Sequence, residues 1–118
     1  KADYNEEVLI HIFKSLAKIE YPIDKDLKPF LEHKNWVVRS QAARYLGEIQ
    51  DSSYLSDLRK LITDEKWWVR YYAALAIFEM GEIEFLIEIV KNKEPGYEMG
   101  RYILDQAGNL RIGEAYSG

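Results

Sequence analysis

Side chains that could support catalysis are few in this sequence. The only histidines are His11 and His33, which fall in different expected helices, and there is no cysteine. No H-E-x-x-H pair or cysteine cluster accompanies them, so the sequence offers no recognisable zinc site. Gly96 and Gly100 flank a turn instead of following a strand, as a phosphate-binding loop would require. We therefore expect a protein that is not an enzyme and that holds no metal or cofactor.

Binding chemistry is better represented. The chain has nine tyrosines and three tryptophans, and tyrosine combined with arginine is enriched among the residues that dominate protein–protein interfaces. For each tyrosine the alternative is that its ring covers a neighbouring helix, because aromatic side chains dominate cores as well as interfaces. The candidate partner-binding residues are Arg44, Tyr45, Tyr71, Tyr72 and Tyr102.

The elements that must position these residues follow a 31-residue repeat. WWVRYYAALAIFEM at 67–80 shares six identities with WVVRSQAARYLGEI at 36–49, where unrelated segments would share roughly one. A fixed period in this range indicates stacked helical units. The identical pairs are Trp36 and Trp67, Val38 and Val69, Arg39 and Arg70, Ala42 and Ala73, Ala43 and Ala74, and Glu48 and Glu79.

Apolar residues at three- and four-residue spacing predict where the helices lie. Ser52 or Ser53 is the expected cap of one first helix, and Gly81 is expected to close the second helix that follows it. The first helices are expected at about 24 or 26 to 33, 53–63 and 82–92, and the second helices begin at Trp36, at Trp67 and after Gly96.

These helices predict a single repeat domain over residues 1–108. Residues 3–20 would be the second helix of a truncated repeat, and complete repeats would span about 22–50, 53–81 and 82–108. The chain would then begin in mid-repeat, as a piece of a longer array. Residues 109–118 show no periodicity and are expected to form a frayed tail.

Each second helix is expected to have one inward and one outward side. Trp36 and Trp67 are interpreted as packing residues between repeats, and Trp68 as the tryptophan that is free to be exposed. If Val38, Ala42, Leu46 and Ile49 point inward, the outward residues are Ser40, Gln41, Arg44, Tyr45, Glu48, Tyr71, Tyr72, Leu75, Phe78, Glu79, Tyr102, Ile103 and Gln106.

The pattern V-R-x-x-A-A-x-x-L-G at residues 38–47, preceded by a short helix, resembles the short HEAT-like repeat of the phycobilin-lyase type. The resemblance covers about residues 8–107. It implies an all-α, right-handed α-solenoid of about three and a half helical hairpins, whose second helices line a concave face. A hydroxylase of this family binds iron through His-Glu pairs directly after V-R. Ser40-Gln41 and Tyr71-Tyr72 occupy those positions here, which excludes that activity.

The resemblance also implies an acid-to-arginine pair within each repeat. The pair maps to Asp64 and Arg70, whereas His33 stands opposite Arg39. We interpret Arg39, Arg70 and Arg101 as structural residues that bind turn carbonyls or an acidic partner, because function on a shared fold lies in added sites. The alternative is a column of guanidinium groups that faces an anionic ligand.

Composition limits the class of partner. The net charge of −4 disfavours a nucleic-acid-binding protein, which needs lysine and arginine to balance phosphate charge. No apolar run approaches the roughly 18 residues of a membrane span, so we expect no direct membrane insertion in this segment. A cytoplasmic setting is compatible with the sequence.

The sequence thus favours a non-enzymatic scaffold that binds a protein or peptide partner on its concave face. A second hypothesis, implied by the resemblance, is lyase-like or carrier binding of a small aromatic or tetrapyrrole-type ligand. A third and less favoured hypothesis is recognition of a DNA lesion by an aromatic cradle. Incomplete terminal repeats could also associate end to end, because solenoids usually need polar caps.

Overall fold

The computed structural model of the chain describes residues 7, 10–11 and 26–116, with side chains up to residue 108. The expected truncated repeat at 3–20 falls almost wholly outside these residues. Within the described part the regular elements are all helices.

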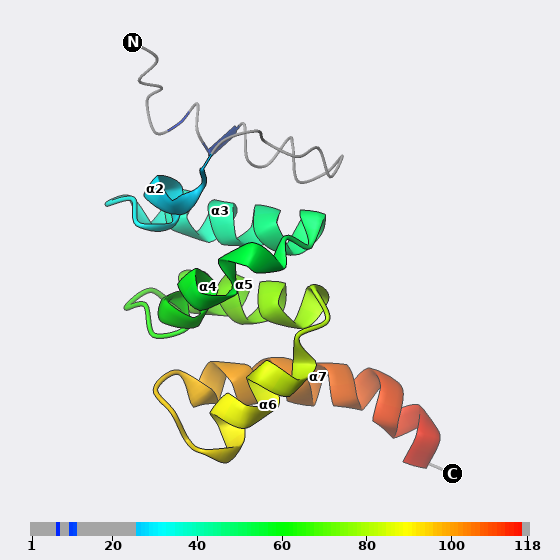
Figure 1. The fold of residues 1–118 in the computed structure, drawn as a ribbon. Coiled ribbons are helices and arrows are strands. Elements are labelled where there is room, and N and C mark those ends of the chain that lie inside the picture. Colours follow the sequence, from blue (N-terminus) through cyan, green and yellow to red (C-terminus); the bar gives the residue numbers. More distant parts are fainter. Residues whose placement is uncertain (1–6, 8–9, 12–25, 117–118) are drawn as a thin grey trace.

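Three helical hairpins follow one another along the chain (Figure 1). The second helices lie one beneath another, and the short first helices lie along one side of that stack. This arrangement confirms the expected all-α solenoid. The elements are α2 (Lys28–Leu31) and α3 (Trp36–Ile49); η1 (Ser52–Tyr54), α4 (Leu55–Leu61) and α5 (Trp67–Glu79); and α6 (Ile83–Lys91) and α7 (Tyr97–Tyr116).

Side-chain caps fix the starts of two elements. Asn35 Oδ1 accepts a hydrogen bond from the Val37 N–H at 2.8 Å, so α3 begins at Trp36 as expected. The second hairpin is capped by Asp51, and the prediction of Ser52 or Ser53 is wrong. Asp51 Oδ1 accepts from both the N–H and the hydroxyl of Ser53, at 3.1 and 2.6 Å, because a carboxylate oxygen can accept two donors.

The end of α5 is closed by Gly81, as the sequence predicts. Its φ of 84° is in the left-handed region that glycine enters without strain. The Gly81 N–H donates to the Phe78 carbonyl and the Glu82 N–H to the Ile77 carbonyl, at 3.0 and 3.1 Å. These two bonds satisfy carbonyls that the helix end would otherwise leave unpaired.

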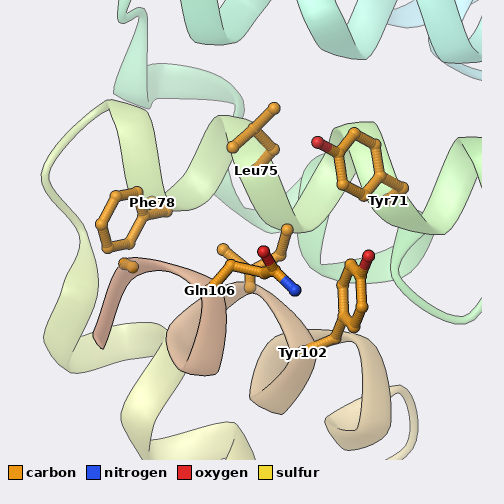
Figure 2. A pocket seen from close by; sticks show the side chains of 7 residues that line it. Tyr71, Leu75, Phe78, Tyr102 and Gln106 are labelled. Carbon is orange, nitrogen blue, oxygen red and sulfur yellow. The ribbon is translucent and has the colours of Figure 1, made fainter. Parts of the chain in front are cut away.

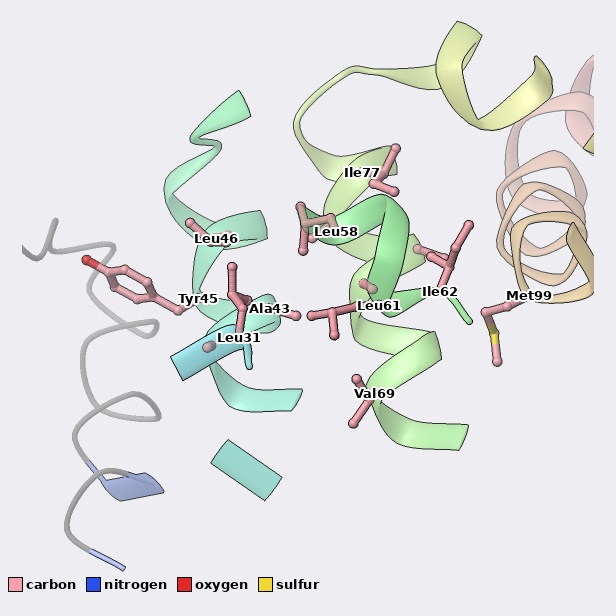
Figure 3. Close-up of a cluster of buried hydrophobic side chains, with 14 of the residues drawn as sticks. Leu31, Ala43, Tyr45, Leu46, Leu58, Leu61, Ile62, Val69, Ile77 and Met99 are labelled. Carbon is pink, nitrogen blue, oxygen red and sulfur yellow. The ribbon is translucent and has the colours of Figure 1, made fainter. Parts of the chain in front are cut away.

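Small residues bring α3 and α5 close together. A Cβ added to Gly47 would lie 2.9 Å from the Cα of Ala76, so only glycine fits at this crossing. Ala42, Ala43 and Ala73 are fully buried, and Figure 3 shows Ala43 within the buried cluster. The expectation that small side chains permit the stack is therefore confirmed. Larger apolar side chains complete the core: Leu27, Leu31, Val38, Leu46, Leu58, Leu61, Ile62, Val69, Ile77, Leu86, Ile89, Met99 and Ile103.

A nearly buried ion pair joins the first two hairpins. Arg39 Nε and Nη2 donate to the two carboxylate oxygens of Asp64 at 2.9 and 3.1 Å, and Arg39 Nη1 donates to the His33 carbonyl at 2.7 Å. Arg70 Nη1 donates to the carbonyl of Asp64 at 2.9 Å. The expected pair of Asp64 with Arg70 is thus wrong. Arg70 donates to the backbone carbonyl of Asp64, which is in its own hairpin. The carboxylate of Asp64 instead accepts hydrogen bonds from Arg39 of the preceding hairpin.

The last helix is longer than the repeat predicts. The backbone of α7 continues from Tyr97 to Tyr116, where the sequence analysis expects a frayed tail from residue 109. Residues 109–116 lack the regular spacing of apolar residues from which a packed helix is predicted. They can still form a helix, because a single internal glycine such as Gly108 costs only about 1 kcal/mol relative to alanine.

Candidate functional site

Five aromatic rings form one connected surface at the start of α5 and on α7. We call Trp67, Trp68, Tyr71, Tyr72 and Tyr102 the aromatic surface. Trp67 stacks on Tyr71 with ring centroids 5.2 Å apart and planes at 10°, and Trp68 stacks on Tyr72 at 6.0 Å and 28°. Tyr102 meets Trp67 edge-on at 6.0 Å and Tyr71 at 6.4 Å. Within each stacked pair the two residues are four positions apart in α5, a spacing that places their side chains on the same helix face.

Much of this surface is open to solvent. Trp67, Trp68 and Tyr102 are 41, 49 and 43 % exposed. Tryptophan is usually largely buried, so two neighbouring exposed tryptophans mark a surface suited to binding. The prediction that Trp68 is exposed is confirmed. Trp67 contacts Tyr102 of the next hairpin edge-on, in keeping with the predicted packing role between repeats, but its side chain is also 41 % exposed and stacks on Tyr71 of its own helix.

Two pockets border the aromatic surface, and Tyr102 lines both. The apolar pocket, of about 320 Å³, lies between α5 and α7 (Figure 2). The arginine pocket, of about 430 Å³, lies beside the start of α7. The apolar pocket is lined by Tyr71, Leu75, Phe78, Tyr102, Ile103, Gln106 and Ala107, and the arginine pocket by Trp67, Arg70, Gly96, Glu98, Met99 and Tyr102.

The Tyr71 hydroxyl stays protonated at the pH of a cell. Burial raises the pKa of the Tyr71 phenol, and the neighbouring Tyr72, Tyr102 and Glu79 raise it further. A neutral phenol can donate one hydrogen bond as well as accept one. At this site it can therefore orient a ligand but cannot act as a general base.

Three outward residues predicted on α3 are buried instead. Tyr45 is 0 % exposed, Ser40 is 2 % exposed and Gln41 is 8 % exposed. Figure 3 shows the Tyr45 ring on the side of α3 away from Leu58. The helical period predicts the direction of these side chains around α3, but it does not predict whether solvent lies in that direction. Tyr45 is therefore removed from the candidate site.

Arg44 also lies apart from the aromatic surface. It is half-buried, its Nη1 donates to Gln41 Oε1 at 3.3 Å, and it lines neither pocket. Its charge acts on Glu79 at the end of α5. Partial burial and the charge of Glu48 raise the pKa of Glu79, and Arg44 lowers it. Arg44 thus belongs to a charged cluster with Glu48 and Glu79.

Of the predicted partner-binding residues, Tyr71, Tyr72 and Tyr102 lie in the aromatic surface, whereas Trp67 and Arg70, which line the arginine pocket, were not among them. A signal for Trp67 was present, because residues 67 and 71 are one helical turn apart and would stack. Arg70 entered the sequence analysis only in the alternative of a guanidinium column that faces an anionic ligand. The sequence did not indicate its pocket, because the pocket includes residues from the next hairpin.

In the described part of the chain, no three histidine, aspartate or glutamate side chains gather as a metal site would need. None of the helices described there has the length and apolar character needed to cross a bilayer.

The comparison with protein families agrees with the hairpin stack. A family model described as HEAT repeats matches residues 23–98, which is more than half of the chain. This chain belongs to the HEAT repeat family. No curated protein and no solved structure matches it.

HEAT repeats are commonly protein-interaction scaffolds. Membership of the family accounts for the alanine and glycine positions that let the hairpins stack. It does not account for the aromatic surface, because exposed rings contribute little to a repeat core.

Proposed function

We propose that this HEAT repeat chain is a non-enzymatic scaffold that binds a segment of another protein across the aromatic surface. The observation that carries the proposal is the set of five connected rings, three of which are more than 40 % exposed, bordering the apolar pocket. Tryptophan and tyrosine supply large contact area with few rotatable bonds, so ordering them on binding costs little entropy.

The residues proposed to bind the partner are Trp67, Trp68, Tyr71, Tyr72 and Tyr102. Tyr71 and Tyr102 contact each other edge-on at one end of the apolar pocket, and Leu75 and Phe78 line it further along α5 (Figure 2). A partner side chain in this pocket would be surrounded by rings that exclude water. Such central, desolvated pockets hold most of the binding energy of an interface.

The proposal is tested by changing Tyr71 and Tyr72 together to alanine. Partners captured by the immobilised wild-type chain would be identified, and the affinity of each purified partner segment measured for both proteins. We expect the double variant to lose affinity at least about tenfold, since each ring contributes as a hot-spot residue. The control is Glu84→Ala with Glu88→Ala, on the exposed side of α6. Equal affinity for Y71A/Y72A and wild type, with the fold retained, would exclude this surface.

A second candidate function is binding of a small aromatic or tetrapyrrole-type ligand. The apolar pocket favours it, because its volume of about 320 Å³ lies at the lower end of the range for small-molecule sites. Biliverdin is a suitable probe. A shift in its absorption band, or quenching of tryptophan fluorescence by biliverdin, that disappears in Tyr102→Ala would favour this function over peptide binding.

A further inference from the structure

The arginine pocket differs from its counterpart one repeat earlier in a way that points to a ligand. Arg39 and Arg70 occupy the same repeat position, and each donates from Nη1 to the carbonyl six residues before it. Arg39 also forms a two-bond ion pair with Asp64, 25 residues further on. The residue 25 positions after Arg70 is Pro95, which has no carboxylate.

No acidic side chain of the described chain replaces the missing partner. Glu94, next to Pro95, pairs with Arg59 at 2.9 Å. Glu98 lines the same pocket but forms no ion pair with Arg70 within 4.0 Å. Among the described residues, the guanidinium of Arg70 therefore binds one carbonyl and no carboxylate. Its planar fork suits a carboxylate bound through two parallel hydrogen bonds.

The space beside Arg70 is open and has aromatic walls. The arginine pocket has a volume of about 430 Å³, and Trp67 and Tyr102 line it together with Arg70. Tyr102 lines both this pocket and the apolar pocket. A peptide that lies across Tyr102 can thus place an acidic side chain in one pocket and an apolar side chain in the other.

We propose that Arg70 binds an aspartate or glutamate side chain of the partner segment, and that an apolar side chain close to it in sequence enters the apolar pocket. This inference rests on the proposed function and adds the chemistry of the partner. The incoming carboxylate takes the place that Asp64 holds beside Arg39, so that a partner residue completes the ion pair that the third hairpin lacks.

The test is a selection of random peptides against the 118-residue chain. Peptides displayed with their C-termini fused to a coat protein can supply carboxylates only from side chains. We expect enriched peptides to combine an acidic residue with a nearby apolar or aromatic residue. The same selection on Arg70→Gln should lose the acidic preference, whereas Arg101→Gln should keep it. Arg101 is the matched control, one repeat further on, with a 70 % exposed side chain.

A synthetic copy of the most enriched peptide then measures the pairing directly. Replacing its acidic residue with the matching amide should weaken binding to the wild-type chain at least about tenfold, and to Arg70→Gln less than about twofold. Arg70→Lys keeps the charge but loses the fork, so an intermediate loss is expected. If a substitution at Arg70 unfolds the protein, the acid-to-amide change in the peptide still tests the proposal, because it uses only the wild-type chain.

The outcomes separate the two proposals. The role of Arg70 would be overturned if the enriched peptides need Tyr102 but show no acidic preference. It would also be overturned if they keep that preference on Arg70→Gln. In both cases the aromatic surface would remain a binding site. If no peptide is enriched, both proposals are contradicted. An affinity that depends equally on Arg70 and Arg101 would indicate general charge attraction and would also overturn the specific pairing.

Discussion

At the residue scale, the ionisation of Glu79 affects the stability of the folded chain. Glu79 is the last residue of α5, where the partial negative charge of the helix end disfavours an ionised carboxylate. Partial burial, first, and the charge of Glu48, second, raise its pKa above the ordinary value, and Arg44 opposes them. The chain therefore carries a carboxylate whose ionisation works against folding.

Replacing Glu79 with glutamine is expected to raise the melting temperature at neutral pH. Because the folded chain holds this proton more tightly than the unfolded chain, the free energy of unfolding falls as pH rises from the ordinary glutamate pKa through the raised one. Glutamine removes that loss. The gain should be largest above the raised pKa and vanish below the ordinary pKa, in thermal melts between about pH 3 and pH 8.

The matched control is Glu84→Gln, an exposed change on α6 that should alter the melting temperature little. A gain at Glu79 that did not vary with pH would show that ionisation is not its cause.

At the scale of elements, glycine at position 47 sets the distance between α3 and α5. These two helices form the most extensive contact between elements of the described chain. The contact depends on a missing side chain, because a Cβ on Gly47 would meet both the Ala76 backbone and Glu79 Oε1, at 2.9 and 2.6 Å. The Glu79 end can rotate away, whereas the Ala76 backbone moves only if the helices separate.

Gly47→Ala is therefore expected to destabilise the chain, although alanine has the higher helix propensity. The packing loss should lower the free energy of unfolding by about 1–3 kcal/mol. Urea denaturation would measure it, with Ser56→Ala on the exposed side of α4 as the control. An increase in stability would mean that helix propensity outweighs the close approach.

The pair of Arg39 with Asp64 joins the first two hairpins through charge. Both side chains are nearly buried, at 13 and 10 % exposure, so screening by water is weak. Removing one partner leaves the other charge buried without compensation.

Arg39→Met should lower the free energy of unfolding by about 3 kcal/mol. Arg101→Met should change it by less than about 0.5 kcal/mol, because an exposed pair such as that with Asp105 contributes little. Urea denaturation of the two variants measures both values. Equal effects would contradict a special role for the pair between hairpins.

At the scale of the whole molecule, the stability of the described chain depends on contacts between neighbouring hairpins. The central helix α5 contacts α3, α4, α6 and α7, whereas α7 contacts chiefly α5 and α6. In such a stack, stability is approximately a sum over repeats and their nearest-neighbour interfaces. The binding surface lies across the boundary between α5 and α7, so loss of the third hairpin would also remove both pockets.

Gly100→Val tests this arrangement. Even a Cβ at Gly100 would lie 3.1 Å from Val90 Cγ2, so valine should loosen α7 from α6. Hydrogen exchange should show reduced amide protection in α6 and α7 and protection close to wild type in α3 and α4. Uniform loss of protection over the three hairpins would show that the stack unfolds as one cooperative unit.

The sequence alone determined the repeat and the elements. The starts of α3 and α5 at Trp36 and Trp67, the close of α5 at Gly81, and the small residues between helices were all predicted correctly. These features depend on hydrogen bonds and side-chain spacing within one turn or one hairpin, which are local in the sequence. The binding role of Tyr71, Tyr72 and Tyr102 stays a prediction.

Only the tertiary structure decided which sides of the helices are covered. In the folded chain Tyr45 is buried and Trp67 is exposed. The Asp64 carboxylate pairs with Arg39, and Arg70 lines a pocket. The pairing of Arg39 depends on a contact between hairpins, because Asp64 lies 25 positions away in sequence. A helical period gives the direction of a side chain around its own helix. Whether a neighbour or solvent lies in that direction is set by how the hairpins pack.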